Sequence, residues 1–147
     1  MNKESPASML NEPQRRGLSS TFRILEEMLL EIETMINSDG FEGNLMVIEN
    51  DVSSQAREKI LMIIELVREK LNSLSKQLAL EIKQTKMSSQ ILADLSYCWE
   101  ILEGSKAKKL KRYGDVATGI KESLDPDLNI IITLILDIEH ILRTIQK

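Results

Sequence analysis

The sequence predicts an all-α protein: an up-down-up-down four-helix bundle with a long second helix and a protruding hairpin between its second and third helices. Two observations predict this class. The composition is aliphatic and charged, with 42% hydrophobic residues, 29% charged residues and only 3% aromatics, as is typical of helical bundles. Apolar side chains also recur at three- and four-residue intervals in four segments. We therefore expect a flexible tail over residues 1–18 and a single bundle domain over residues 19–147.

The first two helices are predicted from their apolar stripes. The first covers residues 19–37, where a serine can cap the start and the turn sequence NSDG ends the helix. Its apolar stripe consists of Phe22, Leu25, Leu29, Ile32 and Ile36. The second covers residues 52–85, with Asp51 or Ser53 as its cap, and is roughly 50 Å long against roughly 28 Å for the first. Its apolar residues alternate at intervals of four and three, the period of coiled-coil-like packing: Ile60, Ile64, Val67, Leu71, Leu74 and Leu78.

The third helix is predicted over residues 89–112, with an interruption at Gly104 and Ser105. A rod that continues unbroken from the second helix into the third is the alternative, because no Gly or Pro occurs between residues 44 and 103. We favour a turn at residues 83–90, where polar side chains replace the apolar stripe and serines can cap a new helix.

The closing segment, residues 125–147, is predicted as the last helix, with Asp125 as its N-cap and Pro126 in its first turn. Its apolar run is too short for the roughly 20 residues that cross a bilayer. The rest of its surface is mainly Ile and Leu, so we expect neighbours to wrap it on most sides. Its polar residues fall on one narrow stripe: Asn129, Thr133, Asp137, His140 and Thr144.

The protruding hairpin would carry more aliphatic surface than one contact between two helices can hide. Such a surface usually marks an association site. An alternative is that the N-terminal tail folds back over the hairpin through Met9, Leu10 and Leu18. The predicted interface consists of seven residues: Leu74, Leu78, Leu80, Ile82, Ile91, Leu92 and Leu95.

The connection at residues 39–52 is long for a helical bundle and contains the apolar sequence LMVI at residues 45–48. We predict that it plugs the end of the bundle together with Phe41. The alternative is a lip that binds a partner.

The net charge of −4 and the pI near 5.2 do not favour general attraction to nucleic acid or anionic lipid. One segment, KAKKLKR, is nevertheless strongly basic. It could bind phosphate, RNA backbone or an acidic partner, or its cations could simply complement the carbonyl end of a helix. This candidate anion patch consists of Lys106, Lys108, Lys109, Lys111 and Arg112.

No catalytic or metal site is expected. Asp137 and His140 are three residues apart and could share a metal, but a single His and a single Cys are too few for the usual sites. Glu27 and Glu31 could form an acid/base pair only if one were buried, and a solvated face is expected. Cys98 is expected to be a buried structural thiol. Because a lone cysteine forms no internal disulfide and no secretory leader is evident, we expect a cytoplasmic protein.

These observations favour a non-enzymatic, adaptor-like protein that acts through protein–protein interaction or self-association, as a homodimer. The alternative is a regulatory bundle that binds a small ligand or an anion between its helices or at the basic segment. No cofactor and no nucleic-acid partner are expected. The motifs identify no family, and a bundle by itself assigns no function.

Overall fold

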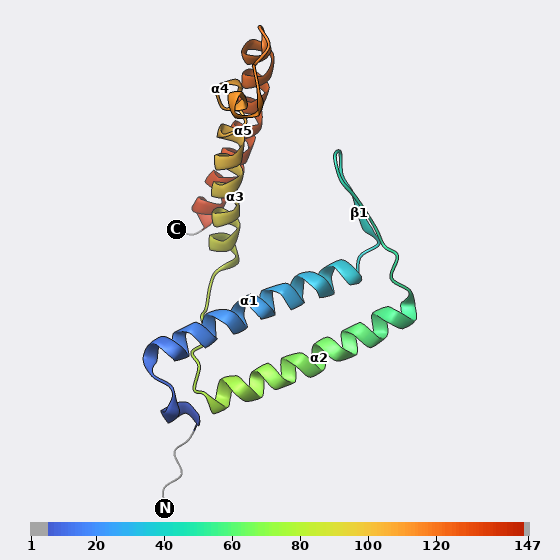
Figure 1. Ribbon diagram of the computed structural model, residues 1–147, viewed down its shortest axis with the longest axis vertical. Coiled ribbons are helices and arrows are strands. Elements are labelled where there is room, and N and C mark those ends of the chain that lie inside the picture. Colours follow the sequence, from blue (N-terminus) through green and yellow to red (C-terminus); the bar gives the residue numbers. More distant parts are fainter. Residues whose placement is uncertain (1–5, 146–147) are drawn as a thin grey trace, which may run out of the picture. The chain divides into compact units, whose positions relative to one another are not determined.

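A computed structural model describes residues 6–145 and confirms that this part of the chain is predominantly helical (Figure 1). The chain divides between Ile82 and Lys83 into two compact units, and each is described by itself. Each unit contains one pair of long helices, so the four-helix bundle is not confirmed. The elements in chain order are η1 (Pro6–Met9), α1 (Glu12–Ile36), β1 (Gly40–Glu42), β2 (Val47–Glu49), α2 (Ser54–Gln77), α3 (Met87–Glu103), α4 (Ala107–Leu110), η2 (Lys111–Tyr113) and α5 (Ile120–Ile145).

In the first unit, α1 and α2 lie side by side and run in opposite directions (Figure 1). Helix α1 begins at Glu12, before the predicted start, because a capping box precedes it. The Asn11 side chain accepts a hydrogen bond from the Gln14 amide at 2.8 Å, and the Gln14 side chain accepts one from the Asn11 amide at 3.0 Å. Residues 12–18, expected in the tail, therefore belong to a helix. Residues 1–5 of that tail lie outside the described residues.

Helix α2 ends at Gln77, so the prediction of a long second helix is wrong. A Schellman motif ends it. Ala79 adopts a φ of 51°, its amide donates to the Lys76 carbonyl at 3.2 Å, and the Leu80 amide donates to the Ser75 carbonyl at 2.9 Å. With 25 residues in α1 and 24 in α2, the two helices nearly match in length. The predicted hairpin of protruding helices is replaced by a non-helical connection that leads to α3.

The residues predicted to plug the end of a bundle instead form an antiparallel β-hairpin between α1 and α2, with Phe41 opposite Ile48. Only glycine fits at Gly40, where φ is 98° and a Cβ atom would lie 2.3 Å from the Ile48 carbonyl oxygen. The prediction of a plug is wrong, because Phe41 is 54% exposed and Leu45, at the tip, is fully exposed.

The core of the first unit lies between its two helices. Leu29 of α1 clusters with Ile64 and Leu71 of α2, and all three are buried. An ion pair between Arg68 and Glu33 also joins the helices. Side-chain hydrogen bonds raise the pKa of Arg68, and the bond to Glu33 contributes more than the bond to Glu65. Arg68 therefore stays charged at any working pH. Five partly buried residues pack against this cluster: Phe22, Leu25, Ile60, Leu61 and Val67. All of them except Leu61 belong to the predicted stripes.

In the second unit, α3 packs against α5, and Gly104 follows the end of α3 as predicted. Helix α5 begins at Ile120, so the prediction that Asp125 is its N-cap is wrong. The Asp125 carboxylate caps a different helix, because it accepts a hydrogen bond at 2.9 Å from the amide of Ala107, the first residue of α4. Lys106, which precedes α4, provides no side-chain cap.

Neighbours cover less of α5 than the sequence predicts. Leu128 and Ile132 are buried, and α3 and α4 are the helices that pack most against α5. The predicted polar stripe is present and exposed, but apolar side chains on another face are exposed as well, including Ile130 at 58%. The prediction that neighbours wrap this helix on most sides is therefore wrong for the described residues.

Candidate functional site

A row of exposed aliphatic side chains runs along α5 in the second unit, and we call it the α5 seam. Its members follow one another at intervals of three, four, three and four residues, the spacing of the a and d positions of a coiled coil. Each is between 44% and 68% exposed. The α5 seam consists of Ile131, Leu134, Ile138, Ile141 and Ile145.

The α5 seam is separate from the face that α5 presents to its neighbours. At 100° per residue, Leu128 and Ile132 define one side of the helix, and the seam lies on another. Between Leu128 and Leu136 the helix carries no charged residue. Asp137 borders the seam and belongs to the exposed polar stripe. The first half of the seam is therefore an aliphatic surface without a charged neighbour on the helix, and the second half adjoins Asp137.

The seven residues predicted as an interface are distributed over both units. Leu74 lies in α2, the next three residues of the set, Leu78, Leu80 and Ile82, lie in the connection after it, and the last three lie in α3. All are half-buried except Ile82, which is 90% exposed. The structure therefore does not gather them on a single helical hairpin.

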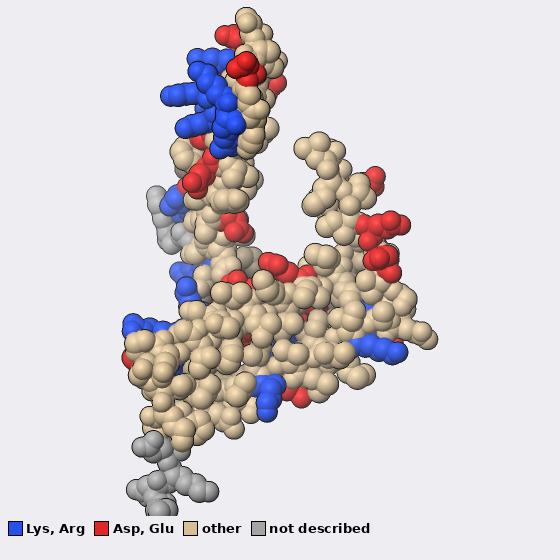
Figure 2. Space-filling model, in the orientation of Figure 1, with Lys and Arg blue, Asp and Glu red and all other residues tan. Residues whose placement is uncertain are grey.

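The basic segment lies at α4 and η2, at one end of the second unit, where Figure 2 shows Lys and Arg side chains gathered. Two of its five cations have interactions within the chain. The Lys106 ammonium pairs with Glu103 at 3.1 Å, and the Arg112 guanidinium lies 4.9 Å from the centre of the Tyr113 ring. The other three, Lys108, Lys109 and Lys111, are exposed.

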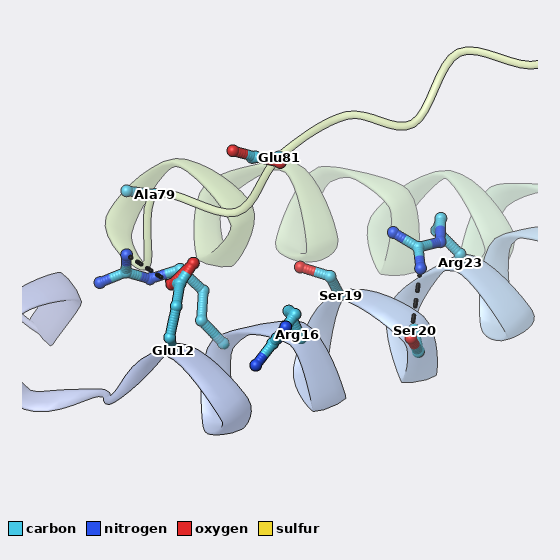
Figure 3. Close-up of a pocket in the computed structure, with 8 residues that line it drawn as sticks. Glu12, Arg16, Ser19, Ser20, Arg23, Ala79 and Glu81 are labelled. Atoms are coloured by element: carbon cyan, nitrogen blue, oxygen red, sulfur yellow. Dashed lines mark hydrogen bonds and ion pairs between the residues drawn. The ribbon is translucent and has the colours of Figure 1, made fainter.

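A second cationic feature, which we call the arginine hollow, lies in the first unit (Figure 3). It has a volume of about 210 Å³ between the first half of α1 and the residues that follow α2. Arg15 pairs with Glu12 at 3.7 Å, and Arg23 donates to the Ser20 hydroxyl at 3.2 Å. The lining combines three guanidinium groups and two hydroxyls with two carboxylates: Arg15, Arg16, Arg23, Ser19, Ser20, Glu12 and Glu81.

Sequence reasoning missed the arginine hollow because residues 12–18 were assigned to a tail. The available signal was the capping box at Asn11 and Gln14, which starts a helix there. In that helix Arg16 and Arg23 are seven residues apart and share one face with the serines between them.

The other candidate residues do not assemble into a site. Asp137 and His140 are exposed on the polar stripe, Glu27 and Glu31 are exposed on α1, and the Cys98 thiol is only half-buried. No group of three or more His, Cys, Asp or Glu residues in the described part of the chain could hold a metal ion. Within residues 6–145, no helix combines the length and apolar character needed to cross a membrane.

Comparisons with known proteins add no relative: no protein-family model, no curated protein and no solved structure matches the chain.

Proposed function

We propose that this chain is a non-enzymatic interaction protein that self-associates through the α5 seam, with a second copy of the chain as its partner. The observation that carries this proposal is the exposure of five aliphatic side chains at coiled-coil spacing on one helix. Two α3–α5 pairs that meet through this seam would complete a four-helix arrangement across two copies. The apolar periodicity that predicts a four-helix bundle would then be buried between two copies of the chain.

Energetic considerations support this assignment. Full burial of one aliphatic side chain contributes roughly 1.5–3 kcal/mol, so covering the exposed half of five such side chains contributes roughly 4–8 kcal/mol per copy. Two copies together can offset the cost of association, which is about 4–15 kcal/mol. A second copy suits the seam because it offers the same uncharged aliphatic row, while a strongly charged partner would gain no ion pairs along it.

The test is the mass of the native full-length chain by light scattering. We expect twice the chain mass of 16.7 kDa. The double variant Leu134→Asp with Ile141→Asp places two carboxylates in the seam, so it should give the single-chain mass while circular dichroism shows retained helix.

The matched control is Thr133→Asp with Thr144→Asp, which adds the same charge on the polar stripe of the same helix. This control should retain the dimer mass. A wild-type chain with the single-chain mass at every concentration, or seam and control variants with identical masses, would remove the proposal.

A second candidate function, anion binding, is supported by the arginine hollow. Guanidinium groups and hydroxyls are the groups that hold phosphate oxygens, and Arg16 and Arg23 lie on either side of Ser19 and Ser20 along one helix face. The carboxylates of Glu12 and Glu81 leave the lining with a small net positive charge. Pyrophosphate is a suitable probe, because several guanidinium groups can contact its oxygens at once.

Calorimetric titration with pyrophosphate tests this candidate. Arg16→Gln with Arg23→Gln should weaken binding about a hundredfold or more, since each charge-assisted hydrogen bond contributes roughly 1.5–3 kcal/mol and two are lost. Arg57→Gln, on α2, is the control and should bind as the wild type does. Absence of heat with the wild type, or equal loss in the control, excludes the site.

A further inference from the structure

The first unit has an apolar hollow at the base of the β-hairpin, where the end of α1 meets β2. It is open to solvent and has a volume of about 230 Å³. The interior is aliphatic: Ile36 is buried and Ile48 is half-buried, while Ile32 is 46%, Met35 54% and Val52 37% exposed. A dry protein cavity of about 150 Å³ holds benzene, so this hollow has room for one aliphatic side chain from outside.

The hollow has an acidic rim, formed by Glu49 and Asp51. Residues 37–52 contain two further carboxylates, Asp39 and Glu42, and no Lys or Arg. Figure 2 shows acidic side chains gathered at the hairpin. The rim therefore presents a negative field around an apolar interior, a combination that repels a second copy of the same acidic hairpin and attracts a cation.

The base of the hairpin is held in place by its own hydrogen bonds. The Asn50 side-chain amide donates to the Ser38 carbonyl at 2.8 Å, and its side-chain oxygen accepts a hydrogen bond from the Val52 amide at 3.0 Å. These bonds hold the end of β2, which carries Glu49, and the residues that follow it, which include Asp51. A preorganised rim loses little conformational entropy when a ligand binds.

We infer that this hollow binds a peptide segment of a partner protein in which one aliphatic side chain is flanked by lysine or arginine. The aliphatic side chain enters the space between Ile36 and Ile48, and the flanking cations pair with Glu49 and Asp51. The inference goes beyond the proposed function, because the hollow lies in the first unit and the α5 seam lies in the second.

The experiment is an NMR titration of the ¹⁵N-labelled full-length chain with three synthetic pentapeptides. The first carries one leucine between two pairs of lysines. In the second, serine replaces the leucine, and in the third, glutamates replace the lysines. We expect the leucine–lysine peptide to cause saturable shifts that are confined to the amides of residues 32–52. The serine peptide should bind about tenfold more weakly, since the burial of one aliphatic side chain is lost, and the glutamate peptide should cause no shifts.

Two variants locate the contacts. Glu49→Gln with Asp51→Asn keeps the size of both side chains and should weaken the leucine–lysine peptide about tenfold. Glu58→Gln with Glu69→Gln removes the same charge from exposed positions of α2 and should leave binding unchanged.

Each alternative result overturns the inference. Equal binding of the serine and leucine peptides would show charge attraction without an apolar site. Shifts outside residues 32–52, or no shifts at all, would exclude the hollow as the binding site. These results are separate from the mass of the native chain, so this inference and the proposed self-association can fail independently.

Discussion

The two helical pairs differ in how far each completes its own core. In the first unit, Leu29, Ile64 and Leu71 form a buried cluster between α1 and α2. In the second, α3 has no buried residue and α5 has two. Exposed apolar residues of α1 such as Met28 are interleaved with Glu27 and Glu31, whereas α5 exposes an uninterrupted aliphatic seam. A helix that is apolar over more of its circumference than one neighbour can cover favours a further partner, which is why we propose association through the second unit.

The largest effect is expected when the core of the first unit is disrupted. Ile64 is 5% exposed, and Ile64→Ala should destabilise the first unit by about 2–4 kcal/mol, because it removes buried methyl groups and leaves a cavity. Urea unfolding followed by circular dichroism measures the loss.

Trp99, the only tryptophan of the chain, lies in α3 and reports on the second unit. Its fluorescence transition should not move in Ile64→Ala. An equal shift of both signals would show that the two units unfold as one.

A second large effect is expected at the hairpin of the first unit. Gly40→Ala forces a Cβ atom against the Ile48 carbonyl at a positive φ, which should destabilise the hairpin by about 1–3 kcal/mol. Hydrogen exchange should accelerate in residues 40–49 and remain unchanged in α5. Unchanged exchange in the hairpin would contradict the assigned backbone conformation.

A smaller effect is expected in the second unit. Asp125→Ala removes the acceptor for the Ala107 amide and should cost about 1 kcal/mol, the usual value of a helix cap. The Trp99 transition should shift to lower urea, and Asp125→Asn should restore most of the loss. An Asp125→Ala transition identical to that of the wild type would show that this cap does not stabilise the unit.

The smallest effect is a gain in the first unit. Ala79 has a left-handed conformation that favours glycine, so Ala79→Gly should stabilise that unit by about 0.5–1 kcal/mol. The circular dichroism midpoint should rise while the Trp99 midpoint stays constant. A destabilised variant would mean that the Schellman motif does not end α2 in solution.

The comparison also shows which features the sequence could predict. The stripes that contain Leu29, Ile64 and Leu71 were predicted because helical periodicity is a local property of the chain. The end of α2 was not, because alanine occupies the position where glycine would have signalled a Schellman motif. The hairpin was missed because each strand has three residues, too few to establish a two-residue period.

The role of Asp125 as a cap of α4 and the exposure of the α5 seam depend on contacts between segments that are distant in the sequence. Local sequence patterns do not determine such contacts. Asp125 was predicted as a cap, which it is, but for a helix that begins 18 residues earlier. The aliphatic character of α5 was predicted correctly, but the expectation that neighbours in the chain wrap this helix on most sides was wrong for the described residues.

Hydrogen exchange of the full-length chain at two concentrations tests directly whether a second copy covers the α5 seam. If the α5 seam is covered by a second copy, roughly hundredfold dilution should accelerate exchange across residues 128–145 and leave residues 54–71 of α2 unchanged. Exchange in α5 that does not depend on concentration would contradict the account.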